Sequence, residues 1–528
     1  MPTGEMPPMT ATAAATPPAG VLRAVRVILD PTPRQAAALA SHAGAARAAF
    51  NYHLAQKMAA HRAYAAEVAY RTYTDFAGLD PNAAYAAAKK AVTAAKTHRI
   101  PGMPDSIKKM YADPDYGWLP EVNRYAISSG MRAADTAWSN WLSSLRGERS
   151  GPRVGYPRFK KKGRARSAFT LYHDVKAPSL RPDGPRRWRF PAKVGGSIRL
   201  KGNVRRLARR LARGTARVKN VTIALSGGQW VASILVEDFA QLPAGPTRRQ
   251  RAAGPVGVDV GVTHLAALST GEHVPNPRHL ARAQARLVKA QRALSRTQWR
   301  VEDTSELVAV PTRGRRHVET SGRRKARARL AKAHAKVAQA RATTLHALTK
   351  TLATSYEVVV VEDLAVKGMT AAPAARPDPD RPGAFLPNGA AAKGGLNRAV
   401  LDAAFGEIRR QLTYKTSWFG SSLQVAPRFY PSSKTCSACG AVKAKLRLAE
   451  RVFSCPACGH AEDRDINAAK NLAARSWTPA ESGSLETPVE PAHASRRRAS
   501  DDAGRPWPPR APVTVGEESP TRPPPIPA

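Results

Sequence analysis

Two Cys-x-x-Cys turns constrain this chain more than any other feature of its sequence. Cys436 and Cys439 form the first turn, and Cys455 and Cys458 form the second after a gap of fifteen residues. Each turn can aim two thiolates at one point, and two such turns complete a tetrahedron around Zn²⁺. Because the chain has no fifth cysteine, we predict a closed structural zinc ribbon over residues 426–459, with a redox-active dithiol as the weaker alternative.

The chain is also strongly basic. Its 528 residues include 84 Lys and Arg against 39 Asp and Glu, a formal net charge of +45. Such a field favours a polyanionic partner over a small acidic metabolite. No stretch approaches the roughly 18 apolar residues of a membrane span, and the first twenty residues lack the pattern of a signal peptide. We therefore expect a cytoplasmic protein without membrane contact that binds nucleic acid and is associated with the nucleoid when on DNA.

Two segments concentrate the positive charge. Residues 153–219 hold 22 Lys and Arg against two acids, and they lead into a predicted hairpin, VTIAL to WVASILV. This pattern predicts a β-barrel-like module with phosphate-binding loops. Residues 278–300 place basic side chains at steps of three and four, which predicts one stripe on a helix that pairs with a second helical arm, 323–353. The expected nucleic-acid contacts are Lys160, Lys161, Lys162, Arg164, Arg282, Arg286, Lys289, Arg292 and Arg296.

The N-terminal region reads as one strand followed by helices. The run VLRAVRVILD predicts the strand, and Thr32-Pro33 predicts a helix N-cap with proline at the first helical position. Ala-rich helical sequence continues to about residue 146. It contains an apolar stripe at helical spacing: Ile127, Met131, Ala134, Trp138 and Trp141. We interpret the two tryptophans as core residues rather than as a base-stacking surface.

Three carboxylates occupy positions where a nuclease core would need them. Asp259 lies in the middle of the apolar run VGVDVGV, Glu362 ends the run YEVVVVE, and Asp465 begins a helix in DRDINAAKNL. Together they could hold two Mg²⁺ ions for phosphodiester cleavage. Taken singly, each has an ordinary explanation: a turn residue, a strand-end cap in which Asp363 could replace Glu362, and a helix N-cap. Their joint placement favours the metal site.

Several segments, in this order along the chain, resemble the TnpB/OrfB family. They include PTPRQAAALASHAGAARAAFNYHL, PRFKKKGRARSAF, GVDVGVTHLAALSTGE, VVVVEDLAVKGMT, FYPSSKTCSACG and DRDINAAKNL, spread over residues 22–475. The family comprises insertion-sequence proteins known as transposases, related to type V CRISPR effector nucleases. The resemblance implies an RNA-guided DNA endonuclease that holds a guide RNA and cuts double-stranded target DNA. It maps the catalytic trio onto Asp259, Glu362 and Asp465, with Asp463 as the alternative to Asp465.

The resemblance also implies an α/β multidomain fold. An RNase H-like (RuvC) core with an inserted zinc ribbon would follow an N-terminal β-barrel-like wedge module, itself interrupted by a helical recognition domain. Residues 301–322 and 371–395 look like enlarged loops, the second placed as a flexible lid would be. The expected ranges are disordered tails at 1–20 and 476–528, the wedge module at 21–31 and 153–245, the helical domain at 32–152, the nuclease core at 254–425 and 460–475, and the zinc ribbon at 426–459.

Two other functions compete with the nuclease. One is a catalytically inactive, RNA-guided or directly DNA-binding regulator of the same fold. The other is a strand transferase with a tyrosine nucleophile, which normally uses a His-x-His metal site. None of the 13 histidines lies two residues from another, so the sequence disfavours the transferase. The sequence indicates no particular oligomeric state.

Overall fold

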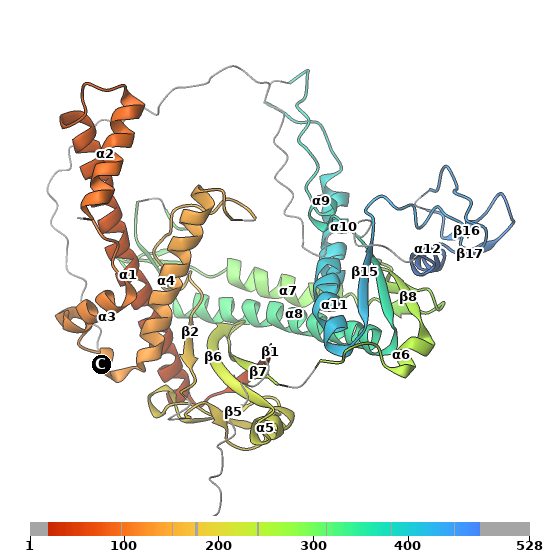
Figure 1. The fold of residues 1–528 in the computed structure, drawn as a ribbon, viewed down its shortest axis with the longest axis horizontal. Helices are drawn as coiled ribbons and strands as arrows, with labels where there is room; N and C mark the ends of the chain where they lie inside the picture. The colour runs from red at the N-terminus through yellow and green to blue at the C-terminus, as the bar shows by residue number, and fades with distance from the viewer. Residues whose placement is uncertain are drawn as a thin grey trace, which may run out of the picture.

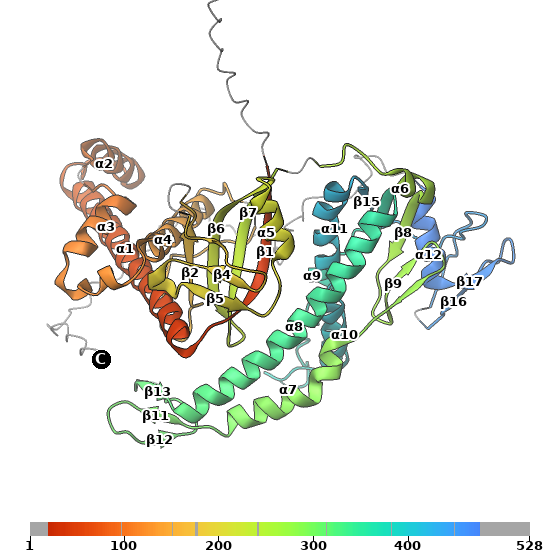
Figure 2. The same ribbon diagram turned by 90° about the horizontal axis from the view of Figure 1, so that it is seen from below.

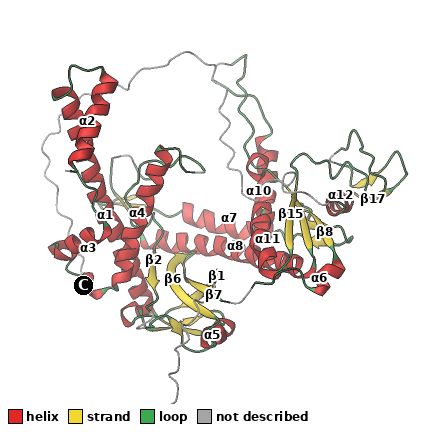
Figure 3. Cartoon of the chain, viewed as in Figure 1, coloured by secondary structure: helices red, strands yellow, loops and turns green. Residues whose placement is uncertain are grey.

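The computed structural model describes residues 20–475, apart from 97, 150, 175–177, 240–241, 313, 382 and 448. The two expected tails, 1–20 and 476–528, lie outside the described residues except for Gly20. The described chain forms two lobes, which a long helical hairpin connects along one side (Figures 1 and 2). One lobe holds the N-terminal helices and a seven-stranded sheet, and the other holds a five-stranded sheet with its covering helices (Figure 3).

Four helices follow the first strand. They are α1 (Pro33–Thr74), α2 (Pro81–Ala95), α3 (Met103–Ala112) and α4 (Arg124–Leu145), with short 3₁₀ turns at Pro114–Tyr116 and Leu119–Glu121. Thr32 caps α1 in a capping box with Gln35, and Pro33 is the first helical residue, as the sequence predicts. Trp138 and Trp141 are buried, which confirms their core interpretation. Helices α1 and α4 cross so closely that a side chain at Gly130 would collide with the Ala46 carbonyl.

The seven-stranded sheet follows the order β2-β6-β7-β1-β5-β4-β3. Its strands are β1 (Val21–Asp30), β2 (Ala168–Tyr172), β3 (Arg181–Pro182), β4 (Arg187–Arg189), β5 (Ser197–Leu200), β6 (Ala216–Ser226) and β7 (Gln229–Asp238), with a 3₁₀ turn at Ala192–Val194 and helix α5 (Arg205–Ala212). β1 pairs first with β7 and then with β5, so one strand belongs to both halves of the sheet. The predicted β6–β7 hairpin is confirmed. Since β2 and β3 remain edges among the described strands, the sheet is not a closed barrel.

The five-stranded sheet follows the order β10-β9-β8-β14-β15. Its strands are β8 (Pro255–Asp259), β9 (His264–Leu268), β10 (His273–Pro275), β14 (Val358–Glu362) and β15 (Ser422–Ala426). β8, β14 and β15 run parallel, whereas β9 and β10 add antiparallel neighbours, so the expectation of a central parallel strand at β14 is confirmed. Asp259 is the last residue of β8, not the middle of a strand as expected, because the run bends at Val260 and Gly261 toward β9.

Helices cover both faces of this sheet. On one face lie α8 (Ser321–Ser355), α10 (Ala390–Ala403) and α11 (Phe405–Phe419), which pack against Val359 and Val361 of β14. On the other lies α12 (Arg464–Ala473), whose Leu472 packs against Val360. Alternation of side chains along β14 therefore separates the two layers. α12 approaches β8 so closely that a side chain at Gly257 would collide with the Ala469 carbonyl. Short helices α6 (Arg248–Ala253) and α9 (Val366–Met369) complete this lobe.

The predicted helical hairpin consists of α7 (His279–Ser295) and α8. Its two arms are joined by a small sheet of β11 (Trp299–Val301), β12 (Leu307–Val308) and β13 (His317–Glu319). Two expectations are therefore corrected. Arg300 lies in β11 rather than on the helical stripe, and the presumed loop 301–322 carries strands and the start of α8.

The hairpin also supports the contact between the lobes. The glycine pair at the β6–β7 turn lies on α8, where a side chain at Gly227 would fall 2.2 Å from Cβ of Ala335. The Arg23 guanidinium of β1 lies 4.2 Å from the ring centre of Trp418 in α11.

Residues 390–395 of the expected lid segment belong to α10. None of the helices in the described ranges combines the length and apolar character that crossing a membrane requires.

Candidate metal and nucleic-acid sites

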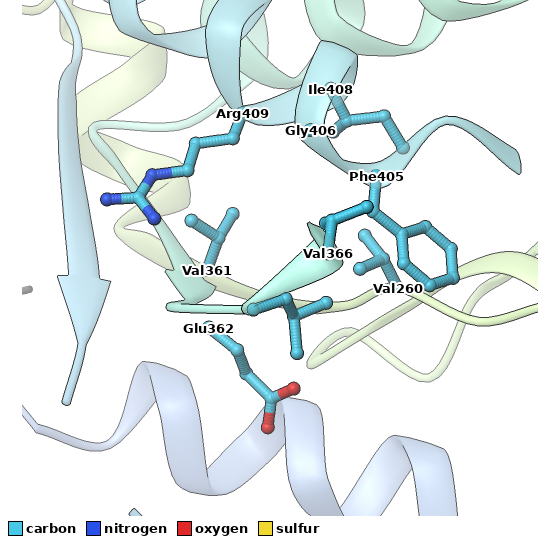
Figure 4. A pocket seen from close by; sticks show the side chains of 9 residues that line it. Val260, Val361, Glu362, Val366, Phe405, Gly406, Ile408 and Arg409 are labelled. Atoms are coloured by element: carbon cyan, nitrogen blue, oxygen red, sulfur yellow. The ribbon is translucent and has the colours of Figure 1, made fainter. Parts of the chain in front are cut away.

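Three acids from separate elements meet at one edge of the five-stranded sheet. Asp259 and Glu362 end β8 and β14, neighbouring parallel strands whose carboxyl ends share that edge. Asp465 lies in the first turn of α12, which packs across β8 and β14. Glu362 lines a small cavity with Val366 and Phe405, and its carboxylate group points away from those two side chains (Figure 4). The topology thus brings together residues that are 206 positions apart along the chain.

Two of these acids, Asp259 and Glu362, have raised pKa values. Burial raises the pKa of Asp259 well above its ordinary value, and the carboxylates of Glu362 and Asp465 raise it further. The nearby Arg464 guanidinium opposes this rise. Burial also raises the pKa of Glu362, although the Ser432 hydroxyl, which donates a hydrogen bond of 2.5 Å, acts in the opposite direction. Buried carboxylates that repel one another are stabilised by a cation between them.

The three acids are spread more widely than the four cysteines. Among the described residues, only the four cysteines place three or more ligand atoms all within 4.8 Å of one another, so the acidic trio is spread more widely than that. Two ions about 4 Å apart, each with oxygen ligands at about 2.1 Å, span roughly 8 Å. A site for two such ions tolerates a wider spread of carboxylates than a site for one ion.

The structure distinguishes the roles of Asp465 and Glu362 from those of the adjacent acids Asp463 and Asp363. Asp463, not Asp465, is the N-cap of α12, and its carboxylate accepts the backbone N–H groups of residues 465 and 466 at 3.0 Å each. The N-cap explanation of Asp465 is therefore wrong. Asp363 is 8% exposed and forms ion pairs with Arg409 and Arg428, so it is a structural acid. Glu362 has no such cationic partner among its described hydrogen bonds and ion pairs.

The four cysteines are close enough to hold one metal ion. The Sγ atoms of Cys436 and Cys458 are 3.7 Å apart, and those of Cys439 and Cys455 are 3.6 Å apart. A tetrahedron with metal–sulfur distances of about 2.3 Å has edges of about 3.8 Å. All four are free thiols. The residue after each turn is a glycine with a positive φ whose N–H closes the turn, which is why both turns end in glycine.

The cysteine cluster is connected directly to the helix that carries Asp465. The buried side chains of Asn467 and Asn471 donate hydrogen bonds to the Thr435 carbonyl at 2.8 and 2.6 Å, and Asn471 also donates to the Ser432 carbonyl. Asn467 in turn accepts the N–H of Ser437 at 2.9 Å. Sequence reasoning missed these amides, although their spacing of four residues places both on one helix face.

Comparison with known proteins identifies the chain. Residues 236–372 match a family profile described as the probable transposase OrfB of IS605, residues 405–472 a Cas12f1-like TNB domain, and residues 21–65 a helix-turn-helix domain. A Mycobacterium tuberculosis protein named "Putative RNA-guided DNA endonuclease Rv2885c" is 34% identical over 496 residues, 92% of each chain. The chain belongs to the TnpB/OrfB family.

Other similar proteins differ in how much they share with this TnpB/OrfB chain. The Streptomyces pristinaespiralis relative, also named a putative RNA-guided DNA endonuclease, is 33% identical over 68% of this chain and 73% of its own length. A solved Cas12f1–sgRNA–target DNA complex is 12% identical, covering 86% of this chain and 99% of that one with a TM-score of 0.38. Within the segment matched as helix-turn-helix, the structure has strand β1 and one continuous helix, α1.

The basic side chains of this TnpB/OrfB protein differ in exposure. Those predicted on α7 and at its C-cap are exposed, as are Lys161, Lys162 and Arg164. Lys160 is different because its Nζ lies 3.7 Å from the ring centre of Phe50, and Asn51 hydrogen-bonds its backbone. Burial lowers the pKa of Lys160. The structure therefore gives Lys160 a packing role, while its neighbours face solvent.

The raised pKa of Asp259 predicts a stability gain on neutralising it. A carboxyl whose folded-state pKa is raised contributes stability at low pH that is lost as pH rises through that pKa. We expect Asp259→Asn to raise the Tm of protein without added magnesium by roughly 2–4 °C at about pH 8, and by less at about pH 5. Thermal unfolding at both pH values measures this, with the exposed Asp303→Asn as control. An equal gain at both pH values would contradict it.

Proposed function

We propose that this chain is an RNA-guided, Mg²⁺-dependent DNA endonuclease encoded by an insertion sequence. The convergence of Asp259, Glu362 and Asp465 at one sheet edge carries the proposal. The raised pKa values of Asp259 and Glu362, together with the position of Asp465 beside them, suit the three acids to hold two Mg²⁺ ions, which would supply activation of water and stabilisation of the leaving oxygen. The protein's own part is to hold the three carboxylates, with Ser432 orienting Glu362.

The same proposal assigns the parts of the fold. The five-stranded sheet with α8, α10, α11 and α12 would be the RNase H-like core, and the four-cysteine unit inserted before α12 would be a structural zinc ribbon. The seven-stranded sheet and α1–α4 would be the wedge module and the helical recognition domain, holding guide RNA and target DNA. The names of the relatives as RNA-guided DNA endonucleases support this assignment.

The decisive experiment uses protein purified with its co-expressed RNA. Sequencing the RNA that co-purifies defines the guide, and a matched duplex flanked by a randomised segment then serves as substrate with Mg²⁺. We expect the wild type to cut and Asp259→Ala not to cut, with both binding the duplex. If wild type binds the matched duplex but cuts no better than Asp259→Ala, the chain is the inactive, RNA-guided regulator instead.

The exposed stripe on α7 predicts a change in salt dependence. Each lost phosphate contact lowers the slope of log K against log salt by about 0.9 on duplex DNA. Replacing three stripe residues with Gln should therefore reduce the slope by about 2–3. Titration of duplex binding at several salt concentrations measures it, and equal slopes for the test and control variants would contradict the prediction. The test variant is Arg282→Gln/Arg286→Gln/Lys289→Gln, and the matched control is Arg248→Gln/Arg249→Gln/Lys350→Gln, three exposed basic residues on α6 and α8 away from the stripe.

A further inference from the structure

Phe429 exposes its phenyl ring to solvent on the turn that follows β15. It is 91% exposed, more than any other large apolar side chain in the described ranges. Single exposed apolar residues are common on protein surfaces, so exposure alone assigns no role. The position of Phe429 does indicate a role, because this residue occupies the turn that links β15 to the cysteine cluster, within three residues of Ser432.

The turn that carries Phe429 is fixed on both sides. The Tyr430 N–H donates to the Pro427 carbonyl at 3.0 Å and closes the turn. On one side, the Arg428 guanidinium donates to Asp363 at 2.8 and 3.1 Å. On the other side, Ser432 donates to Glu362 and accepts from Asn471 through its carbonyl. An exposed ring on so constrained a backbone does not result from local disorder.

These anchors place the turn that carries the ring next to the candidate catalytic carboxylates. Arg428 precedes Phe429 and binds the residue after Glu362, whereas Ser432 follows it and binds Glu362 itself. The turn is thus held across the end of β14 at the edge where the acids converge. The loop itself is basic, because its charged residues over 427–435 are Arg428 and Lys434. An aromatic face in a basic setting suits a nucleotide.

We propose that Phe429 stacks on an unpaired nucleobase beside the scissile phosphate and holds a single strand of DNA across the acidic site. Every base has a π-face, so stacking on an aromatic ring tolerates any sequence. In an intact duplex both faces of each base are already covered by neighbouring base pairs. The ring therefore fits single-stranded DNA, the form that guide pairing leaves unpaired. This inference rests on the proposed function and names the form of the substrate at its site.

The test measures stacking without cleavage. In an Asp259→Ala background, the RNA-bound protein is titrated with a single-stranded oligonucleotide that carries 2-aminopurine next to the expected cut, and stacking quenches its fluorescence. We expect Phe429→Ala to remove the quench and to weaken binding about tenfold. Phe429→Trp should restore both. Val310→Ala, which truncates an apolar side chain 73% exposed between β12 and β13, is the control and should behave as the background.

The outcomes separate the two proposals. Undiminished quenching in Phe429→Ala, or failure of Phe429→Trp to restore it, would overturn the stacking role whether or not the wild type cuts DNA. Loss of the quench in Phe429→Ala with rescue by Trp supports it. Because the assay uses a cleavage-deficient background, failure of the wild type to cut overturns only the nuclease proposal. Circular dichroism of each variant checks that the loss is not unfolding.

Discussion

Asp465→Asn is expected to lower target cleavage by about a thousandfold or more, and Asp463→Asn to change it by only a few fold. Losing one ligand of the two proposed Mg²⁺ ions removes several kcal/mol of transition-state stabilisation. A change of about 1.4 kcal/mol corresponds to a tenfold change in rate. Asp463 instead caps α12 through its carboxylate oxygen. Asn caps a helix about as well as Asp, so the replacement preserves the start of the helix.

This pair of variants tests the assignment within the sequence DRD. Both remove one negative charge two residues apart, so a general electrostatic effect would appear in both. The measurement is the single-turnover cleavage rate of a guide-matched duplex at saturating Mg²⁺. If Asp463→Asn is the inactive variant and Asp465→Asn is near wild type, the catalytic acid is Asp463 and the cap role is secondary.

Cys455→Ser is expected to abolish both metal binding at the cysteine cluster and DNA cleavage. A structural zinc site contributes its binding free energy to folding, so losing one ligand unfolds the unit around it. Asn467 and Asn471 would then lose their partners at Thr435, Ser432 and Ser437. Those hydrogen bonds connect the cysteine unit to α12, so Asp465 would no longer be held beside Asp259.

The measurements are zinc content, limited proteolysis and cleavage rate. We expect about one zinc per wild-type chain, none in Cys455→Ser, and new proteolytic sites confined to residues 427–463. Ser454→Ala, at the adjacent exposed position of β16, should match wild type in all three. Retained cleavage in a zinc-free Cys455→Ser protein would contradict the prediction. Activity that followed reductant rather than chelator would instead favour the redox dithiol.

Features fixed by short-range pattern were predictable from the sequence. The apolar run at β14, the β6–β7 hairpin and the cap at Thr32 all depend on neighbouring residues, and each forms as expected. The paired Cys-x-x-Cys spacing predicted the cluster for the same reason. Local pattern therefore located the elements that carry the candidate site.

Features that depend on tertiary contacts were not predictable. Nothing near Asp363 in the sequence shows that Arg409 and Arg428 neutralise it, and nothing near Lys160 shows that it packs on Phe50. The sequence prediction extended the basic stripe to Arg300 because Arg300 follows Arg296 by four residues, the spacing found on α7. Arg300 nevertheless lies in strand β11. The cap role of Asp463 depends on where α12 begins, which the packing against β8 determines.

The β6–β7 turn shows how a missing side chain can set a dimension of the whole molecule. At Gly227 the backbone rests on α8, and even one methyl group would overlap Ala335. At this point only backbone atoms of the β6–β7 turn separate the seven-stranded sheet from α8, because glycine has no side chain. Any residue larger than glycine would push the β6–β7 turn away from α8 and so shift the seven-stranded sheet relative to the helical hairpin.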